Sequence, residues 1–270
     1  MGRRLRPRAE RRRRCDGGAG APAWKGLPLL RHRAGEAAAV IDPSLDIARY
    51  LDIANEHGWR ITYIFDTHLH ADHLSGARAL AEVTGVELVL NPREPFEFAY
   101  TPLADGSGVP LADDVTLTLS AIHTPGHTMG STSYLLGDAA IFSGDTLFLE
   151  GVGRPDLCDR AEEFAHALYH TLHDKLLQLP DSALVFPSHY GEAVEVHAGK
   201  VVAQCLGTLR QWLPMLSVNE DEFVSWAAGS VPERPPNYVE IVRANQGHST
   251  LNPEELRSLE IGPNRCAISA

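Results

Sequence analysis

Apolar positions along the chain repeat with two different periods, so the sequence predicts strands and helices mixed from one end to the other. Short apolar or alternating runs indicate strands, and apolar residues three to four positions apart indicate amphipathic helices. Strands are expected at residues 37–41, 61–66, 86–90, 115–123, 131–136, 139–143 and 183–186, and helices at 44–58, 74–84 and 160–178. Since no internal repeat divides this order, it favours one layered α/β domain over two independent units.

A dense group of metal-ligand side chains follows the strand predicted at 61–66. The stretch Thr67-His68-Leu69-His70-Ala71-Asp72-His73 places three imidazoles and one carboxylate within six residues. On extended chain, side chains two positions apart point to the same side, so His68 and His70 are expected to reach one ion together. Asp72 and His73 can then face a neighbouring position, which predicts a metal site here.

Three further candidate ligands each follow a predicted strand. They are His127 in His123-Thr124-Pro125-Gly126-His127, Asp145 in Ser143-Gly144-Asp145-Thr146, and His189 in Pro187-Ser188-His189. Ligands collected at strand ends on rigid elements are typical of an open α/β site. Each one alone is a weak signal, but together with the cluster they predict one shared metal centre.

Three other histidines receive a different interpretation. His123 lies on the strand side of the turn, so we expect it to pack or to support the site from outside. His166 and His170, four positions apart on the predicted helix 160–178, could chelate a metal. No carboxylate or cysteine partner is evident for them in the sequence, and a solvated helix face is therefore expected.

The cluster at 68–73, His127 in TPGHT, Asp145 in SGDT and His189 in PSH together resemble the metallo-β-lactamase superfamily. The resemblance runs from about residue 37 to 191. It implies an αββα sandwich with the metal site at one edge of its two sheets. Beside that fold, we expect a disordered arginine-rich arm at 1–24, a catalytic domain at 25–206, and a helical C-terminal extension at 207–270 packed on it.

Within this superfamily, the segment after Asp145 resembles the persulfide dioxygenases, also called sulfur dioxygenases or ethylmalonic-encephalopathy-type proteins. It reads Gly-Asp-Thr-Leu-Phe and then Gly151-Val152-Gly153-Arg154-Pro155-Asp156. Glyoxalase II enzymes usually continue with paired aromatic and basic residues that hold glutathione, which this segment lacks. Ser188-His189-Tyr190-Gly191 likewise stands where glyoxalase II typically has Gly-His-Glu-Tyr.

This resemblance implies a non-haem Fe(II) dioxygenase that converts a thiol persulfide, such as glutathione persulfide, to sulfite and thiol with O2. One Fe2+ would be held by His68, His127 and Asp145, since two histidines and a carboxylate leave open positions for O2 and substrate. The outer groups that orient ligands or bind substrate would be His70, Asp72, His73 and His189. Arg154, pairing with Asp156, would shape the pocket wall or hold a substrate carboxylate.

Two alternatives remain open at this stage. In a glyoxalase II-type hydrolase, His68, His70 and His127 would hold one Zn2+, and Asp72, His73 and His189 the other. Asp145 would bridge the ions, and a bridging hydroxide would attack a thioester such as hydroxyacylglutathione. The third class, a non-enzymatic metal-binding relative, usually loses ligands, whereas all seven residues are present here.

Charge is distributed unevenly along the 270-residue chain, whose net charge is −11. Eight of its 24 basic residues are the arginines between Arg3 and Arg14. The remaining acidic body argues against a nucleic-acid-binding surface on the catalytic domain. No apolar run is long enough to span a membrane. We therefore expect a cytoplasmic protein, or a mitochondrial one if the arm is a transit segment, with the region 191–246 covering the pocket or forming a homodimer contact.

Cysteines are few and widely spaced along the sequence. Cys15, Cys158, Cys205 and Cys266 form no CxxC pair, and no secretory signal precedes them. We therefore expect reduced thiols, none of which has a neighbourhood typical of a nucleophile.

Overall fold

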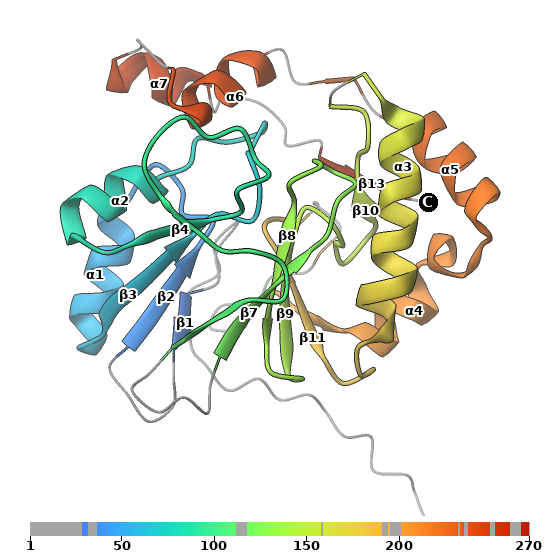
Figure 1. Ribbon diagram of the computed structural model, residues 1–270, viewed down its shortest axis with the longest axis horizontal. Coiled ribbons are helices and arrows are strands. Elements are labelled where there is room, and N and C mark those ends of the chain that lie inside the picture. Colours follow the sequence, from blue (N-terminus) through green and yellow to red (C-terminus); the bar gives the residue numbers. More distant parts are fainter. Residues whose placement is uncertain are drawn as a thin grey trace, which may run out of the picture.

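Figure 1 shows a computed structural model of the protein. The described residues are 29–31, 37–111, 118–157, 159–190, 194, 201–231, 233–234, 237–248, 252–259 and 266–269. The arm predicted at residues 1–24 lies outside this part of the chain.

Two β-sheets form the centre of the described structure (Figure 1). The first has the order β1-β2-β3-β4-β5, in which β1 is antiparallel to β2 and the other neighbours are parallel. Its strands are β1 Leu29–Arg31, β2 Ala37–Ile41, β3 Arg60–Phe65, β4 Leu88–Leu90 and β5 Thr101–Pro102.

The second sheet has the order β12-β11-β9-β8-β7-β6, with β11 parallel to β9 and all other neighbours antiparallel. Its strands are β6 Gly108–Pro110, β7 Thr118–His123, β8 Thr132–Leu136, β9 Ala140–Gly144, β11 Leu184–Pro187 and β12 Gln204–Cys205. A short separate ladder joins β10, Val152–Gly153, to β13, Ala267–Ile268.

Apolar side chains from both sheets meet in one buried layer. Phe65 and Val89 of the first sheet share this layer with Leu119 and Phe142 of the second. Tyr134, which is fully buried between the sheets, donates a hydrogen bond from its hydroxyl to the Asp66 carbonyl at 2.9 Å. The two sheets are therefore stacked face to face, and a cross-sheet hydrogen bond lies close to the first sheet's strand ends.

Helices cover both outer faces and complete the αββα sandwich predicted from the sequence. On the first sheet pack α1, Ala48–His57, and α2, Ala77–Thr84. On the second pack α3, Ala161–His170, and α4, Leu206–Trp212, while α5, Glu220–Gly229, packs along the outer side of α3 (Figure 1). The C-terminal helices α6, Tyr238–Gln246, and α7, Pro253–Leu259, lie at the same end of the molecule as the loops after β3 (Figure 1). Among the described residues, no helix combines the length and apolar character that a membrane crossing requires.

All three helix predictions differ from the structure in their bounds. The helix predicted at 44–58 spans only Ala48–His57. The helix predicted at 74–84 begins only at Ala77, because Ser75 uses its backbone N–H and hydroxyl to bind Asn245 and Asp66. The helix predicted at 160–178 is α-helical to His170 and continues as a π-helical turn, 171–175, and a 3-10 turn, 176–178. The last two changes lie close to segments that carry the candidate site.

Candidate metal centre

The histidine cluster lies in a loop that leaves the end of β3. Residues 66–74 form bends and irregular backbone rather than strand, so the alternation expected for His68 and His70 does not apply. Their rings are 4.1 Å apart between centroids, yet their nitrogens face different partners. The reason given for expecting both to reach one ion, a shared strand face, is therefore wrong.

His68, His127 and Asp145 converge in the buried centre of the loop cluster. The His68 and His127 Nε2 atoms lie 3.9 Å and 3.6 Å from Asp145 Oδ2. All three side chains are almost completely buried. They come from the loop after β3, the turn after β7 and the end of β9, as the strand-end pattern predicted.

The outer nitrogens of the two imidazoles are held by the protein. The Nδ1–H of His68 donates to Thr67 Oγ1 at 2.8 Å, and that of His127 donates to the Arg154 carbonyl at 3.0 Å. Both Nε2 atoms and Asp145 Oδ1 are buried without a hydrogen-bond partner. Burying polar atoms unpaired is costly unless something binds them, and two imidazole nitrogens with a carboxylate oxygen form a suitable metal-ligand set. The residues therefore fit a metal ion.

Burial and neighbouring charges set the protonation of these ligands. Burial together with the adjacent His70 lowers the pKa of His68 well below its usual value, and burial also lowers the pKa of His127. Burial alone would raise the pKa of Asp145, but the nearby His189, His68 and His127 lower it strongly. Neutral imidazoles and an ionised carboxylate are the forms that bind metal.

The four other candidate ligands, His70, Asp72, His73 and His189, surround this triad. The His189 Nε2 atom lies 2.9 Å from Asp145 Oδ2 and 3.6 Å from Asp72 Oδ2. His73 Nδ1 lies 3.2 Å from Asp72 Oδ1. His70 donates from Nε2 to Asp42 Oδ1 at 3.1 Å, which leaves its buried Nδ1 unpartnered on the side of Asp72. The structure thus brings all seven residues together, and His70, Asp72 and His73 form a second group able to hold an ion.

Asp42, directly after β2, organises the support of the cluster, although it was not among the site residues predicted from the sequence. Its Oδ1 accepts the Thr67 N–H at 2.6 Å in addition to the His70 bond. Its Oδ2 accepts the hydroxyls of Thr67, at 3.0 Å, and Ser188, at 2.5 Å. Burial raises the pKa of Asp42, but the His70 charge and these hydrogen bonds outweigh burial and lower it to about 2. Its position directly after the strand predicted at 37–41 is the one local sequence signal that could have indicated it.

The glycines of the 151–156 segment allow two close approaches. A Cβ on Gly153 would lie 1.9 Å from the Asp145 carbonyl oxygen, and one on Gly151 would lie 2.0 Å from the Ile268 carbonyl oxygen. The segment can therefore pass directly beside the ligand Asp145 and pair with β13. Arg154 follows, fully buried, with Nε and Nη2 donating to the two carboxylate oxygens of Asp156 at 2.7 Å and 3.0 Å. The predicted Arg154–Asp156 pair is present.

The residue before β13 adds a thiol that was not predicted as part of the site. Cys266 is buried, and its sulfur lies within 4.8 Å of ligand atoms of Asp72, Asp145 and His189. Its carbonyl accepts the Arg154 N–H at 2.8 Å, next to the β10–β13 ladder. A contact between segments more than 100 residues apart leaves no local pattern. Cys205 is disulfide-bonded, so the expectation of four reduced thiols is wrong for it.

His123 takes the supporting position expected from the sequence. Its Nε2–H donates to the Met129 carbonyl at 2.8 Å, and its Nδ1 accepts from Arg93 at 3.1 Å. Neither nitrogen faces the triad. His123 therefore stabilises the turn that carries His127 and does not bind the metal.

Comparison with known proteins gives a family for this arrangement. The model of the metallo-beta-lactamase superfamily matches residues 29–189. The crystal structure of ETHE1 from Myxococcus xanthus superposes with a TM-score of 0.71 at 31% sequence identity, covering 82% of this chain and 92% of that one.

Curated relatives carry two different activities in their names. The mitochondrial persulfide dioxygenase ETHE1 of Homo sapiens is 33% identical over 164 residues, which is 60% of this chain and 62% of the relative. The hydroxyacylglutathione hydrolase of a Polaromonas species is 36% identical over 157 residues, 57% of each chain. The matches thus span about three fifths of the curated relatives' length. Sequence identity alone therefore does not separate an oxygenase from a hydrolase.

Proposed function

The chain belongs to the metallo-beta-lactamase superfamily, and on that premise we propose that it is an iron-dependent persulfide dioxygenase. Its substrate would be a low-molecular-weight thiol persulfide such as glutathione persulfide. One persulfide, one O2 and one water would give one thiol, one sulfite and two protons. The names of its relatives and the likeness to ETHE1 of Myxococcus xanthus support this assignment.

The observation that carries the proposal is the free face of the triad. His68 and His127 each present a buried, unpartnered Nε2, and Asp145 presents a buried, unpartnered Oδ1. Two imidazoles and one carboxylate on one side of an ion are the ligand set of non-haem Fe(II) oxygenases. Bound Fe2+ would supply adjoining open positions at which O2 and an anionic sulfur can meet.

The surrounding residues would hold this set in place and bind the substrate. Thr67 and the Arg154 carbonyl fix the Nδ1 atoms of His68 and His127, so their Nε2 atoms would stay directed at a bound metal. His189 is placed between Asp145 and Asp72, where its imidazole can hydrogen-bond to a bound anion. His73 Nδ1, which lies 3.2 Å from Asp72 Oδ1, would orient Asp72 from its other side, where His70 Nδ1 faces the same oxygen at 3.9 Å. Arg154 would form a buried wall of the pocket, held by Asp156.

The rival function is a dinuclear zinc hydrolase of the glyoxalase II type, and one observation favours it. His70 keeps Nδ1 buried and unpartnered while its Nε2 is held by Asp42, the same device that prepares His68 and His127. The sequence prediction assigned His70 to the same zinc as His68 and His127, whereas in the structure it groups with Asp72 and His73 and could complete a second metal position there. Relatives named hydroxyacylglutathione hydrolase support this reading.

Metal analysis of anaerobically purified protein, with activity assays, separates the two functions. We expect one iron per chain, oxygen uptake on glutathione persulfide, and sulfite as the product. Two zinc ions per chain with hydrolysis of S-lactoylglutathione and no oxygen uptake would refute the dioxygenase. Asp145→Ala should abolish either activity, whereas His70→Ala should lower the metal count only if two ions bind.

The proposed partners are a small thiol persulfide and O2, with no nucleic acid and no membrane. A homodimer formed through the C-terminal region is a further part of the proposal, testable by light scattering. We place the protein in the cytoplasm, or in the mitochondrion if the arginine-rich arm directs it there. Relatives named as mitochondrial support the second location.

A further inference from the structure

One side chain of the C-terminal helix α6 reaches the loop that carries the histidine cluster. Asn245 is 7% exposed, and its amide forms hydrogen bonds to three backbone groups of this loop. Its Nδ2 donates to the carbonyls of His70, at 2.9 Å, and His73, at 2.8 Å. Its Oδ1 accepts the Ser75 N–H at 2.9 Å. A residue of the C-terminal region therefore binds the backbone of the metal centre directly.

The cluster loop depends on side chains for part of its backbone hydrogen bonding. Residues 66–74 form bends and irregular backbone. A buried N–H or C=O without a partner is costly, so a buried segment of this kind needs partners from elsewhere in the fold. An asparagine amide has two N–H donors and one acceptor oxygen, which match two carbonyls and one N–H. Asn245 supplies all three partners with one side chain.

The two carbonyls that Asn245 holds lie on either side of Asp72 in the loop. Holding the carbonyls of His70 and His73 fixes the peptide units before and after Asp72, and with them the direction of its carboxylate. Asp72 Oδ1 lies 3.2 Å from His73 Nδ1, and Asp72 Oδ2 lies 3.6 Å from His189 Nε2. Groups of a functional site must be held within about 0.5 Å of their working positions. A shift of this loop would therefore disturb the centre.

The end of α6 fixes the position from which Asn245 reaches the loop. The helix ends at Gln246, and Gly247 closes it in the left-handed region, with a φ of 112°. The Gln246 carbonyl accepts the Glu97 N–H at 2.9 Å. A Cβ on Gly247 would lie 3.2 Å from Phe98 Cδ1, so the backbone passes close to this ring. These contacts hold the helix end against the 97–98 segment, next to Asn245.

We propose that Asn245 is a positioning residue of the metal centre and acts through Asp72 and His73. This role rests on the metal centre of the proposed function and is the same for either of its two reactions. The C-terminal region thereby takes part in the site, because α6 provides hydrogen-bond partners that the cluster loop needs.

Co2+ binding to the metal-free protein tests this role, because the visible absorption of bound Co2+ reports the geometry of its ligands. Asn245→Leu keeps nearly the same shape but removes all three hydrogen bonds. Its Co2+ affinity should fall by roughly tenfold, the lower end of the loss expected when an outer partner of a metal site is removed. Its Co2+ spectrum should also shift. In the metal-free variant the Ser75 amide should exchange its hydrogen faster, since its acceptor is gone.

Asn245→Asp separates the acceptor of the amide from its donors. The carboxylate can still accept the Ser75 N–H, so exchange of this amide should stay slow. Both donors to the His70 and His73 carbonyls are lost, and the Co2+ spectrum should therefore still shift.

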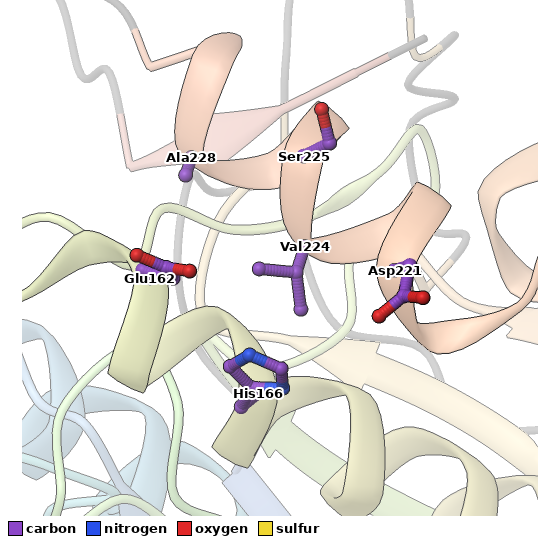
Figure 2. Close-up of a pocket in the computed structure, with 6 residues that line it drawn as sticks. All are labelled: Glu162, His166, Asp221, Val224, Ser225 and Ala228. Carbon is purple, nitrogen blue, oxygen red and sulfur yellow. The ribbon is translucent and has the colours of Figure 1, made fainter.

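Two control variants distinguish positioning from a general loss of stability. Asn237→Ala removes an asparagine amide that donates to the Leu259 carbonyl at 3.3 Å, away from the cluster loop. Val224→Ala enlarges a cavity of about 310 Å³ between α3 and α5, into which Val224 points in Figure 2. It should lower the urea midpoint, because a buried large-to-small change leaves empty space. Both controls should keep the Co2+ affinity and spectrum of the wild type.

Wild-type Co2+ affinity and spectrum in both Asn245 variants would overturn the proposal. An equal loss of Co2+ affinity in Val224→Ala would also overturn it, because lowered stability would then account for the effect. The expected losses in a protein that oxidises no persulfide would support the role of Asn245 and contradict only the proposed dioxygenase.

Discussion

Asp42 offers the sharpest test of how the metal centre is held. The carboxylate is 4% exposed and accepts four hydrogen bonds, two from Thr67 and one each from His70 and Ser188. In Asp42→Ala these donors lose their acceptor inside the protein. Each buried group left unpaired costs about 1–3 kcal/mol, although such costs are not additive.

The expected loss follows from this arrangement. Removing one partner of a buried charged network typically costs about 3–5 kcal/mol, and we expect Asp42→Ala to lose stability in that range. Asp42→Asn should lose less, about 1.5–3 kcal/mol of stability, because it keeps the acceptor but removes the charge beside His70. Its carbonyl can still accept from Thr67 N–H and His70, and the Thr67 and Ser188 hydroxyls can rotate to accept from its amide. Asp42→Ala also removes the acceptor of the Thr67 hydroxyl, which in turn holds His68 Nδ1, so the metal affinity of this variant should fall by roughly ten- to a hundredfold.

Urea unfolding of the metal-free protein measures the loss of unfolding free energy, and metal-competition titration measures the loss of metal affinity. Asp46→Ala serves as the control, because Asp46 is an exposed aspartate whose only described ion pair, to Arg49, is 3.8 Å long. It should change stability by less than about 0.5 kcal/mol. The reasoning would be refuted if Asp42→Ala lost no more stability than this control and bound metal with unchanged affinity.

Three further predictions concern residues around the same site. Gly153→Ala should lower the free energy of unfolding by about 1–3 kcal/mol and weaken metal binding, because the added Cβ would meet the Asp145 carbonyl oxygen. Gly229→Ala is the control: a Cβ there meets nothing within 4 Å, so its urea midpoint should hardly change. Tyr134→Phe should lower the free energy of unfolding by about 1 kcal/mol, because it removes the hydroxyl that donates to the buried Asp66 carbonyl. An unchanged urea midpoint would contradict this. Burial raises the pKa of Asp156, but hydrogen bonds and charges from its two arginine partners outweigh burial and lower it. The contribution of Asp156 to stability is therefore present above the unfolded-state pKa of about 3.9 and is lost as the pH falls below it. The wild type should accordingly lose its stability advantage over Asp156→Asn as the pH is lowered from about 5 to 3.

Much of the fold and site could be predicted from the sequence because the relevant signals are local. The strands β2, β8 and β9 lie within a residue or two of their predicted bounds, since a buried strand leaves a short apolar run. The cluster at 68–73 is contiguous, and each later ligand follows a strand directly. Because strand ends meet at one edge of a sheet, ligand types at strand ends were enough to predict one shared centre.

Only the tertiary structure decided which atoms of those residues are available. His68 and His127 present Nε2 because Thr67 and the Arg154 carbonyl hold Nδ1, while His70 presents Nδ1 because Asp42 holds Nε2. Sequence spacing cannot distinguish the two nitrogens of an imidazole. That choice depends on a hydrogen bond from a group elsewhere in the fold.

The same physical reason explains the residues that the sequence did not reveal. Asp42 reaches the cluster across two parallel strands, and Cys266 arrives through the β10–β13 ladder. Glu220 joins His166 and His170 only because α5 packs along α3. Contacts between distant segments have no period and no local motif, so residue type and spacing established the chemistry while packing between elements determined its geometry.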